Sequence, residues 1–160
     1  MKNLEDVFHH EIKDMYSAEN QLAALLPKMI EATDNSELKN AFMDHLEQTK
    51  SHIEQVKSIC DDLGIKPGGE KCKGMEGLVK EAEHRMKDGE QGPARDAAMI
   101  GAAQRIEHYE IAGYGSAKEY ARMLGKQSVR KQIDKILDED AKCNEILNDI
   151  AVFTVNEKAK

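Results

Sequence analysis

The sequence predicts an all-α protein, and three observations support this prediction. Hydrophobic residues make up 40% of the 160 residues and charged residues 33%, but aromatic residues only 4%, a balance typical of helical proteins. Only three prolines interrupt the chain, so long helices are permitted. Apolar residues recur at steps of three and four over long stretches, as they do on one face of a helix. A chain of this length can bury the core of a single domain, here residues 1–160.

Two helices are expected in the first part of the chain, at residues 4–32 and 36–63. Pro27 lies near the end of the first helix, where the loss of a hydrogen bond bends the last turn. Ser36 is expected to cap the second helix and Gly64 to end it. The inner faces consist of Leu4, Phe8, Ile12, Met15, Leu22, Leu26 and Met29, and then of Leu38, Phe42, His45, Thr49, His52, Val56 and Leu63.

Residues 64–93 break this pattern and form a long crossover connection. The stretch GIKPGGEKCKG cannot continue a helix, but a short amphipathic helix is expected after it, at residues 75–87. The only Glu-x-x-His pair of the chain, Glu81 and His84, falls opposite the apolar face of this helix. We therefore expect both side chains to lie in solvent.

Two more helices are expected at residues 94–124 and 128–155, separated by a turn at Gly125. Two short connections, with one long connection between the helix pairs, are typical of a ferritin-like four-helix bundle rather than of an up-and-down bundle. Two independent hairpins are disfavoured, because a lone helix pair could not bury its apolar face. The inner faces consist of Ile100, Ala103, Glu107, Glu110, Ile111, Tyr114 and Ala121, and then of Val129, Ile133, Ile136, Leu137, Asp140, Leu147 and Ala151.

Charge and cysteine content disfavour several classes of function. A net charge of −7 and the lack of a basic stripe argue against nucleic acids and anionic membranes as partners. No segment has the apolar length of a membrane span or of a secretion signal, so a cytoplasmic protein is expected. Cys60, Cys72 and Cys143 match no zinc or CxxC spacing, and we expect all three to be reduced thiols.

Each of the four long helices places polar side chains on the face that should be buried. These side chains lie near the helix midpoints, which share one level in a bundle of roughly equal helices, so they should converge. Buried carboxylates are costly unless a positive charge compensates them. The one basic residue in the middle of a face, Lys118, lies about three turns from Glu107. The converging groups are Glu19 on the first helix, His45, Gln48 and His52 on the second, Glu107 and Glu110 on the third, and Asp140 on the fourth.

Protons, the two imidazoles or metal ions could compensate the buried acids. Oxygen ligands with imidazole suit iron or manganese, and two such ions bridged by carboxylates would neutralise several acids at once. The alternatives are a rotated helix whose acids reach solvent, and histidines that only hydrogen-bond the carboxylates. Tyr114 is expected to be a core aromatic with its hydroxyl satisfied rather than a donor to the site. Cys143 is expected to be a structural thiol rather than a ligand.

Six segments carry a family resemblance: YSAENQL (16–22), LPKM (26–29), HLEQTKSHIEQV (45–56), MEGL (75–78), RDAAMIGAAQRIEHYEIAGYG (95–115) and LDEDAKCNEIL (137–147). Together they resemble the YciF-type ferritin-like proteins over essentially the whole chain. The resemblance implies a ferritin-like bundle, a homodimer, a dinuclear metal centre and an association with bacterial stress responses. It implies no particular biochemical activity.

The ligand pattern departs from the general ferritin-like pattern, which has one Glu from each of two helices and Glu-x-x-His from each of the other two. Similar proteins usually have Glu at the positions of Gln48 and Asp140. A neutral amide and a shorter acid weaken a second metal position, so two ions, one ion or none remain open. The corresponding pairs here are Glu107-x-x-Glu110, Asp140-x-x-Cys143, and either His45-x-x-Gln48 or Gln48-x-x-x-His52.

Two functions of different classes are consistent with these features. The first is a dinuclear iron or manganese protein that acts on a small oxidant such as peroxide or dioxygen, without an organic cofactor. The second is a metal-free bundle with a structural or protein-interaction role in stress, its acids protonated or paired with histidines. In the first function the carboxylates come from Glu19, Glu107, Glu110 and Asp140, and the nitrogen ligand from His45 or His52.

Overall fold

The computed structural model describes residues 1–160 and contains helices but no strands, which confirms the predicted all-α fold. None of its helices combines the length and apolar character needed to cross a bilayer. The elements are α1 (Leu4–Ala32), α2 (Ser36–Leu63), α3 (Lys73–Arg85), α4 (Pro93–Met123), α5 (Gln127–Ile150) and a final π-helical turn, η1 (Ala151–Val155).

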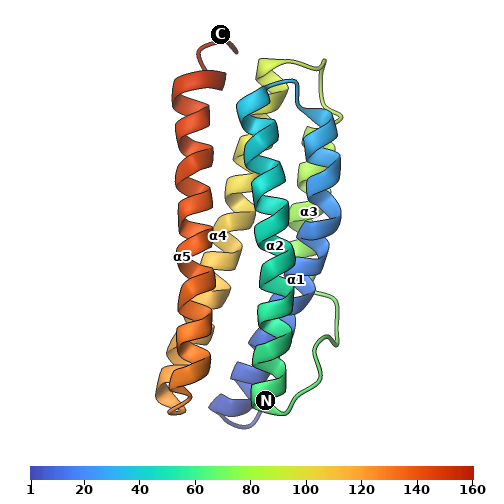
Figure 1. Ribbon diagram of the computed structural model, residues 1–160. Helices are drawn as coiled ribbons and strands as arrows, with labels where there is room; N and C mark the ends of the chain where they lie inside the picture. Colours follow the sequence, from blue (N-terminus) through green and yellow to red (C-terminus); the bar gives the residue numbers. More distant parts are fainter.

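The four long helices lie side by side along one axis (Figure 1). α1 packs along α2 and α4 along α5, while α1 also contacts α4 and α2 also contacts α5. In Figure 1, α1 and α5 rise whereas α2 and α4 descend, so the chain must return the length of the molecule between α2 and α4. The shorter α3 lies in this return segment and packs against the outside of α1 and α4.

The cap of α2 differs from the prediction by one residue. The side chain of Asn35, not Ser36, accepts a hydrogen bond from the backbone amide of Leu38, at 3.0 Å, and Ser36 is the first helical residue. Both residue types are good N-caps, so their order in the sequence does not decide between them. At the other end Gly64 adopts the left-handed conformation, with φ 66°, as is common for a glycine that ends a helix.

The bounds of two later helices also differ from those predicted. α3 starts at Lys73 rather than 75, because the Cys72 sulfur accepts the Met75 amide at 3.4 Å and so caps the first turn. α5 does not continue as a regular helix to residue 155. The Asn156 amide donates to the Ala151 carbonyl, five residues back, which gives the wider turn of η1.

A single hydrophobic cluster of 31 buried residues runs through the molecule and includes residues of every helix. At its centre α1 and α4 approach closely, because Gly113 leaves room for the Met15 side chain. A Cβ atom at position 113 would overlap the Met15 thioether. This close approach brings the polar residues of α1 and α4 near each other.

Candidate metal centre

The four long helices direct their predicted polar residues into the core. This excludes the rotated-helix alternative, since Glu107 is 0% and Glu110 1% exposed. Gln48 differs from the others because it is only half-buried, at the margin of α2. The fully buried groups are Glu19 from α1, His45 and His52 from α2, Glu107 and Glu110 from α4, and Asp140 from α5.

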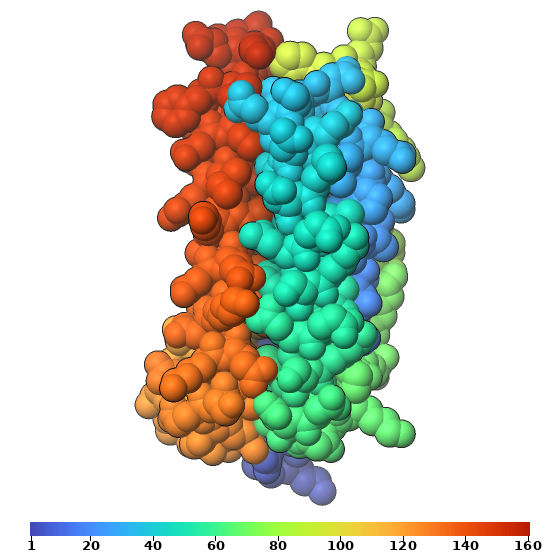
Figure 2. Space-filling view, in the orientation of Figure 1, coloured from blue at the N-terminus to red at the C-terminus, as the bar shows by residue number.

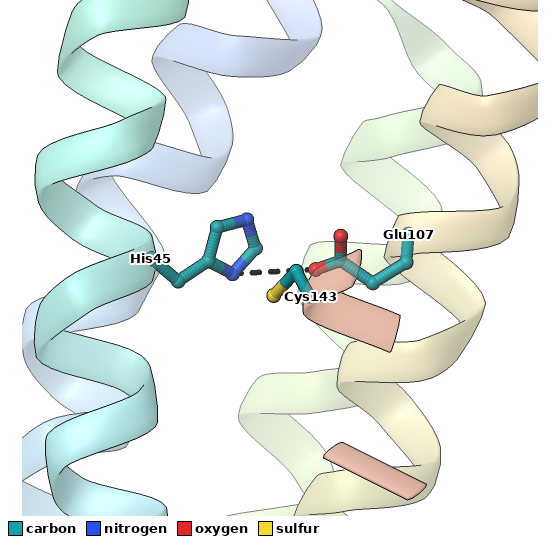
Figure 3. Close-up of side chains that lie close together, drawn as sticks. All are labelled: His45, Glu107 and Cys143. Carbon is teal, nitrogen blue, oxygen red and sulfur yellow. Dashed lines mark ion pairs between the residues drawn. The ribbon is translucent and has the colours of Figure 1, made fainter. Parts of the chain in front are cut away.

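Four of these residues, together with Cys143, form two groups of ligand atoms that share one carboxylate, and Glu19 and His52 belong to neither group. Glu107, Glu110 and Asp140 each offer an oxygen, and these oxygens lie within 4.8 Å of one another. His45, Glu107 and Cys143 offer a nitrogen, an oxygen and a sulfur that also lie within 4.8 Å of one another. Figure 3 shows the second group, in which three side chains from α2, α4 and α5 point toward one another. Glu107 therefore lies between two potential metal positions.

His52 is surrounded by carboxylates on both sides of its ring. Its Nδ1 lies 3.3 Å from Glu19 Oε1 and 3.6 Å from Asp140 Oδ1, and its Nε2 lies 2.7 Å from Glu139 Oε2. Burial alone lowers the pKa of His52, but the hydrogen bond and charge of Glu19, with Asp140 and Glu139, outweigh burial and raise it to about 9. His52 is thus an internal cation at neutral pH.

His45 has the opposite character. Its Nδ1 lies 3.2 Å from Glu107 Oε1 but is not aligned for a hydrogen bond, and neither ring nitrogen has a hydrogen-bond partner. Burial, and then the charge of the nearby His52, lower the pKa of His45 to about 3. At neutral pH His45 is therefore a neutral imidazole with a free lone pair, which is the form that binds metals.

The carboxylates lack partners for most of their oxygens. Both oxygens of Glu107 and of Glu110, Oε2 of Glu19 and Oδ2 of Asp140 are buried without a hydrogen bond. Burial raises the pKa of Glu107, with a further rise from Asp140, and raises that of Glu110, with a further rise from Glu19. Burial and Glu19 raise the pKa of Asp140 to about 8. Without a cation beside them, burial and mutual repulsion favour the protonated forms of Glu107, Glu110 and Asp140.

Tyr114 contacts the cluster directly. It is a buried aromatic with its hydroxyl satisfied, as expected, but the acceptor is the site carboxylate Glu19, whose Oε1 lies 2.6 Å from the hydroxyl. Burial, and then the Glu19 charge, raise the pKa of Tyr114, so the hydroxyl stays protonated and donates. Tyr114 and His52 together hold one oxygen of Glu19 and leave the other free.

Glu139 was not predicted to contact the site and Cys143 was predicted to be a structural thiol, but the structure places both side chains beside the buried polar residues. Glu139 is partly exposed at the margin of α5, and its contact with His52 follows no helical periodicity; its one signal is that it precedes Asp140. In the sequence, Cys143 fits the pattern of an apolar core residue as well as that of a ligand. Only its neighbours in the structure, His45 and Glu107, mark it as a potential ligand. Lys118, in contrast, forms an ion pair with Asp134 and does not compensate the cluster.

A pocket of about 440 Å³ lies between α2 and α5, opens to the surface and reaches two of the three residues of the second group. His45 and Cys143 line its inner part, and Gln48 forms part of its wall together with the charged residues Asp44 and Lys142. The seam between α2 and α5 faces the viewer in Figure 2. Gln48 thus lies on the way into the site rather than among the buried carboxylates.

Comparison with known proteins gives matches over nearly the whole chain. A family model described as a domain of unknown function, DUF892, matches residues 3–160. Protein YciF of Escherichia coli K12 is 42% identical over 100% of this chain and 97% of its own length. The crystal structure of this E. coli stress protein superposes with a TM-score of 0.94, over 99% of this chain and 100% of the other.

Two further solved structures are similar. YcfI of Rhodopseudomonas palustris is 37% identical, with a TM-score of 0.88 over 92% of this chain and 94% of its own. A protein of Xanthomonas campestris shares the fold, with a TM-score of 0.79 over 97% of this chain and 95% of its own at 21% identity. The family match and the identity to the E. coli protein, both over the full length, establish that the chain belongs to the YciF family, whose members carry this domain.

Proposed function

We propose that the chain is a ferritin-like four-helix-bundle protein that binds one or two ions of iron or manganese in its core. Glu19, Glu107, Glu110 and Asp140 provide the carboxylate oxygens, and His45 provides the nitrogen. The observation that carries this proposal is the set of buried carboxylate oxygens without partners on three different helices. Buried polar groups in proteins are nearly always paired, and a bound cation would provide the partner that these oxygens lack.

The donor set fits such ions. Carboxylate oxygens and imidazole are the ligands that iron and manganese accept, and Glu107 belongs to both groups, as a bridging carboxylate must. The two histidines of α2 differ in role: the unpartnered His45 is the ligand, and His52 is a fixed cation that balances Glu19, Asp140 and Glu139. The sequence alone did not decide which of the two histidines is the nitrogen ligand.

We further propose that a small oxidant such as peroxide or dioxygen is reduced at the site. The bound ions would supply the electrons for this reduction. The pocket between α2 and α5 would admit the oxidant to the side of the site that His45 and Cys143 line. Tyr114 would orient Glu19, and the protonated His52 could donate a proton to a reduced product.

The family supports a role in stress. The E. coli relative is described as a stress protein, and we extend that description to this chain as part of the proposal. A homodimer in the cytoplasm belongs to the same proposal. The three cysteines are unpaired, which is consistent with a reducing compartment.

A specific observation favours the second function, a metal-free bundle with a structural or interaction role. His52 already pairs with three carboxylates, and Gln48 adds only a neutral, half-buried amide at the margin of α2. In this alternative the remaining acids stay protonated, and the bundle acts through its surface.

Thermal unfolding in the presence of Mn²⁺ distinguishes the two functions. A ligand of the native state stabilises it by about 2.7 kcal/mol at 100 times its Kd, which raises Tm by ~5–10 °C for a chain of this size. The wild-type protein and the exposed control Glu54→Gln should show this rise. Glu107→Gln should not. An unchanged wild-type melting temperature at saturating Mn²⁺ would favour the metal-free function.

Peroxide consumption tests the oxidant. Protein loaded with Fe²⁺ under anaerobic conditions should consume peroxide faster than the same concentration of free Fe²⁺, and Glu107→Gln should not exceed free Fe²⁺. Metal binding without faster peroxide or dioxygen consumption would keep the metal site and remove the proposed reaction.

A further inference from the structure

Cys143 is the one member of the two ligand groups that the proposed iron or manganese site does not use. Its sulfur lies within 4.8 Å of a ring nitrogen of His45 and an oxygen of Glu107, although the three residues come from three different helices. All three are buried, with exposed fractions of 8%, 3% and 0%. Cys60 is buried in the same hydrophobic core but belongs to neither ligand group.

A second observation points independently to a ligand at this place. Both ring nitrogens of His45 are buried without a hydrogen-bond partner, and Figure 3 shows the ring directed at Glu107 and Cys143. The Cys143 thiol and the Glu107 carboxylate are placed to hydrogen-bond each other, but the His45 imidazole beside them has no hydrogen-bond partner, so an ion bound by all three groups would provide the one it lacks.

The position of Cys143 in the sequence also indicates a metal ligand. Asp140 and Cys143 are three residues apart on α5, so they occupy the two places of the Glu-x-x-His pair in the general pattern of such bundles. The Cys stands where the His would be. At that position a sulfur donor replaces a nitrogen donor, which changes the kind of ion that the position prefers.

We infer that His45, Glu107 and Cys143 form a thiolate metal position that binds a divalent ion of the Zn²⁺, Co²⁺ or Fe²⁺ class, beside the all-oxygen position of Glu107, Glu110 and Asp140. This inference rests on the proposed function, because Glu107 is shared. On binding, the S–H proton of Cys143 passes to solvent and the sulfur bonds to the ion as a thiolate. No electron is transferred in this step.

The surroundings suit entry of a cation. The pocket between α2 and α5 reaches His45 and Cys143 from the surface, and its rim carries two carboxylates, Asp44 and Glu47, against one ammonium, Lys142. A cation from bulk solvent can therefore reach the thiolate position without unfolding of the bundle. Three protein ligands are also the number found at zinc sites that keep a position for water.

Co²⁺ titration of the reduced, metal-free protein tests the inference. A Co²⁺–thiolate bond gives a charge-transfer absorption band in the near ultraviolet that carboxylate and imidazole ligands do not give. We expect this band to grow to a stoichiometric end point in the wild-type protein and in Cys60→Ser. Cys60 is the control because it is buried but belongs to neither ligand group. We expect it to be absent in Cys143→Ser, whose affinity for Co²⁺ should fall at least about tenfold.

Two further measurements keep the inference testable. Glu110→Gln should lose the all-oxygen position and retain the thiolate band. Bound Zn²⁺ should protect one thiol of the wild-type protein from alkylation, and mass mapping should identify it as Cys143. Stoichiometric Co²⁺ binding without a thiolate band in the wild type would overturn the inference and leave the carboxylate site intact. Absence of any stoichiometric Co²⁺, Mn²⁺ or Fe²⁺ binding would overturn the proposed function as well.

Discussion

At the scale of single residues, two histidines two turns apart on the same helix have opposite properties. His52 is held between Glu19, Asp140 and Glu139, so its protonated form is favoured. His45 has no hydrogen-bond partner, and burial favours its neutral form. The same residue type thus provides a fixed positive charge at one position and a free lone pair at the other.

Replacement of each histidine by glutamine should separate these roles. His52→Gln should lower the free energy of unfolding of the metal-free protein by about 3 kcal/mol, because it leaves buried carboxylates uncompensated. His45→Gln should change it by less than about 1.5 kcal/mol, since one unpartnered polar side chain replaces another of similar size. Urea unfolding of both variants measures these differences.

The metal affinities should show the reverse order. His45→Gln should weaken Mn²⁺ binding at least about tenfold, since it removes a ligand. His52→Gln should retain a measurable metal-dependent rise in melting temperature. Equal effects of the two substitutions on both stability and Mn²⁺ affinity would show that the proposed division of roles is wrong.

The buried acids could be predicted from the sequence, but their pairing could not. Helical periodicity directs Glu107, Glu110 and Asp140 to the core, and the structure buries all three. Periodicity gives the same result for His45 and His52, which differ only through contacts with other helices. The contact of Glu139 with His52 depends on how far a long side chain reaches around α5, which no repeat in the sequence encodes.

At the scale of the elements, α3 is attached to α1 and α4 by a close contact at its first turn. The Tyr109 hydroxyl donates to Asp14 Oδ2 at 2.8 Å and lies 2.9 Å from the Cys72 sulfur that caps α3. Gly74 packs directly on the same ring: a Cβ atom there would lie 2.7 Å from Tyr109 Cε2. The absence of a side chain at this position therefore allows α3 to dock.

Gly74→Ala should lower the free energy of unfolding by about 1–3 kcal/mol, because the added methyl group displaces the Tyr109 ring or the end of α3. Gly77 provides a matched control in the same helix, since a Cβ atom there meets nothing within 4 Å. Gly77→Ala should stabilise the protein by about 0.5–1 kcal/mol through helix propensity. A Gly74→Ala variant as stable as Gly77→Ala would contradict this account of how α3 docks.

The positions of the helices followed from the sequence better than their ends did. The apolar periodicity locates each helix because burial of one face dominates its stability. The ends depend on single contacts: the Asn35 cap of α2, the Cys72 cap of α3, and the π-helical turn that follows α5. Cysteine is not a residue type from which an N-cap would be expected.

At the scale of the whole molecule, the cluster links stability to pH. His52 and Asp140 both have pKa values above their ordinary values of 6.5 and 3.8, at about 9 and about 8. A group that binds its proton more tightly when folded stabilises the protein at low pH and loses this contribution as the pH rises through its folded pKa. His45, with a pKa of about 3, acts in the opposite direction only below its ordinary value of 6.5.

The metal-free protein should therefore lose stability between pH 7 and pH 9. Its melting temperature should fall over this interval, and the fall should be smaller in Asp140→Asn, which lacks one of the two titrating groups. With saturating Mn²⁺ the fall should shrink or reverse, because metal binding displaces protons and strengthens as the pH rises. Differential scanning calorimetry across the pH range measures both curves. A metal-free melting temperature that rises from pH 7 to pH 9 would contradict the proposed protonation of the cluster.

The central claim is that acids from separate helices are held together in the core to bind a cation. The most direct measurement is elemental analysis of protein purified without chelator, offered iron or manganese and then freed of unbound ions. The account predicts one or two ions per chain in the wild-type protein and none in the Glu19→Ala/Glu107→Ala double variant, with both proteins folded by circular dichroism. A folded wild-type protein without stoichiometric metal would contradict it.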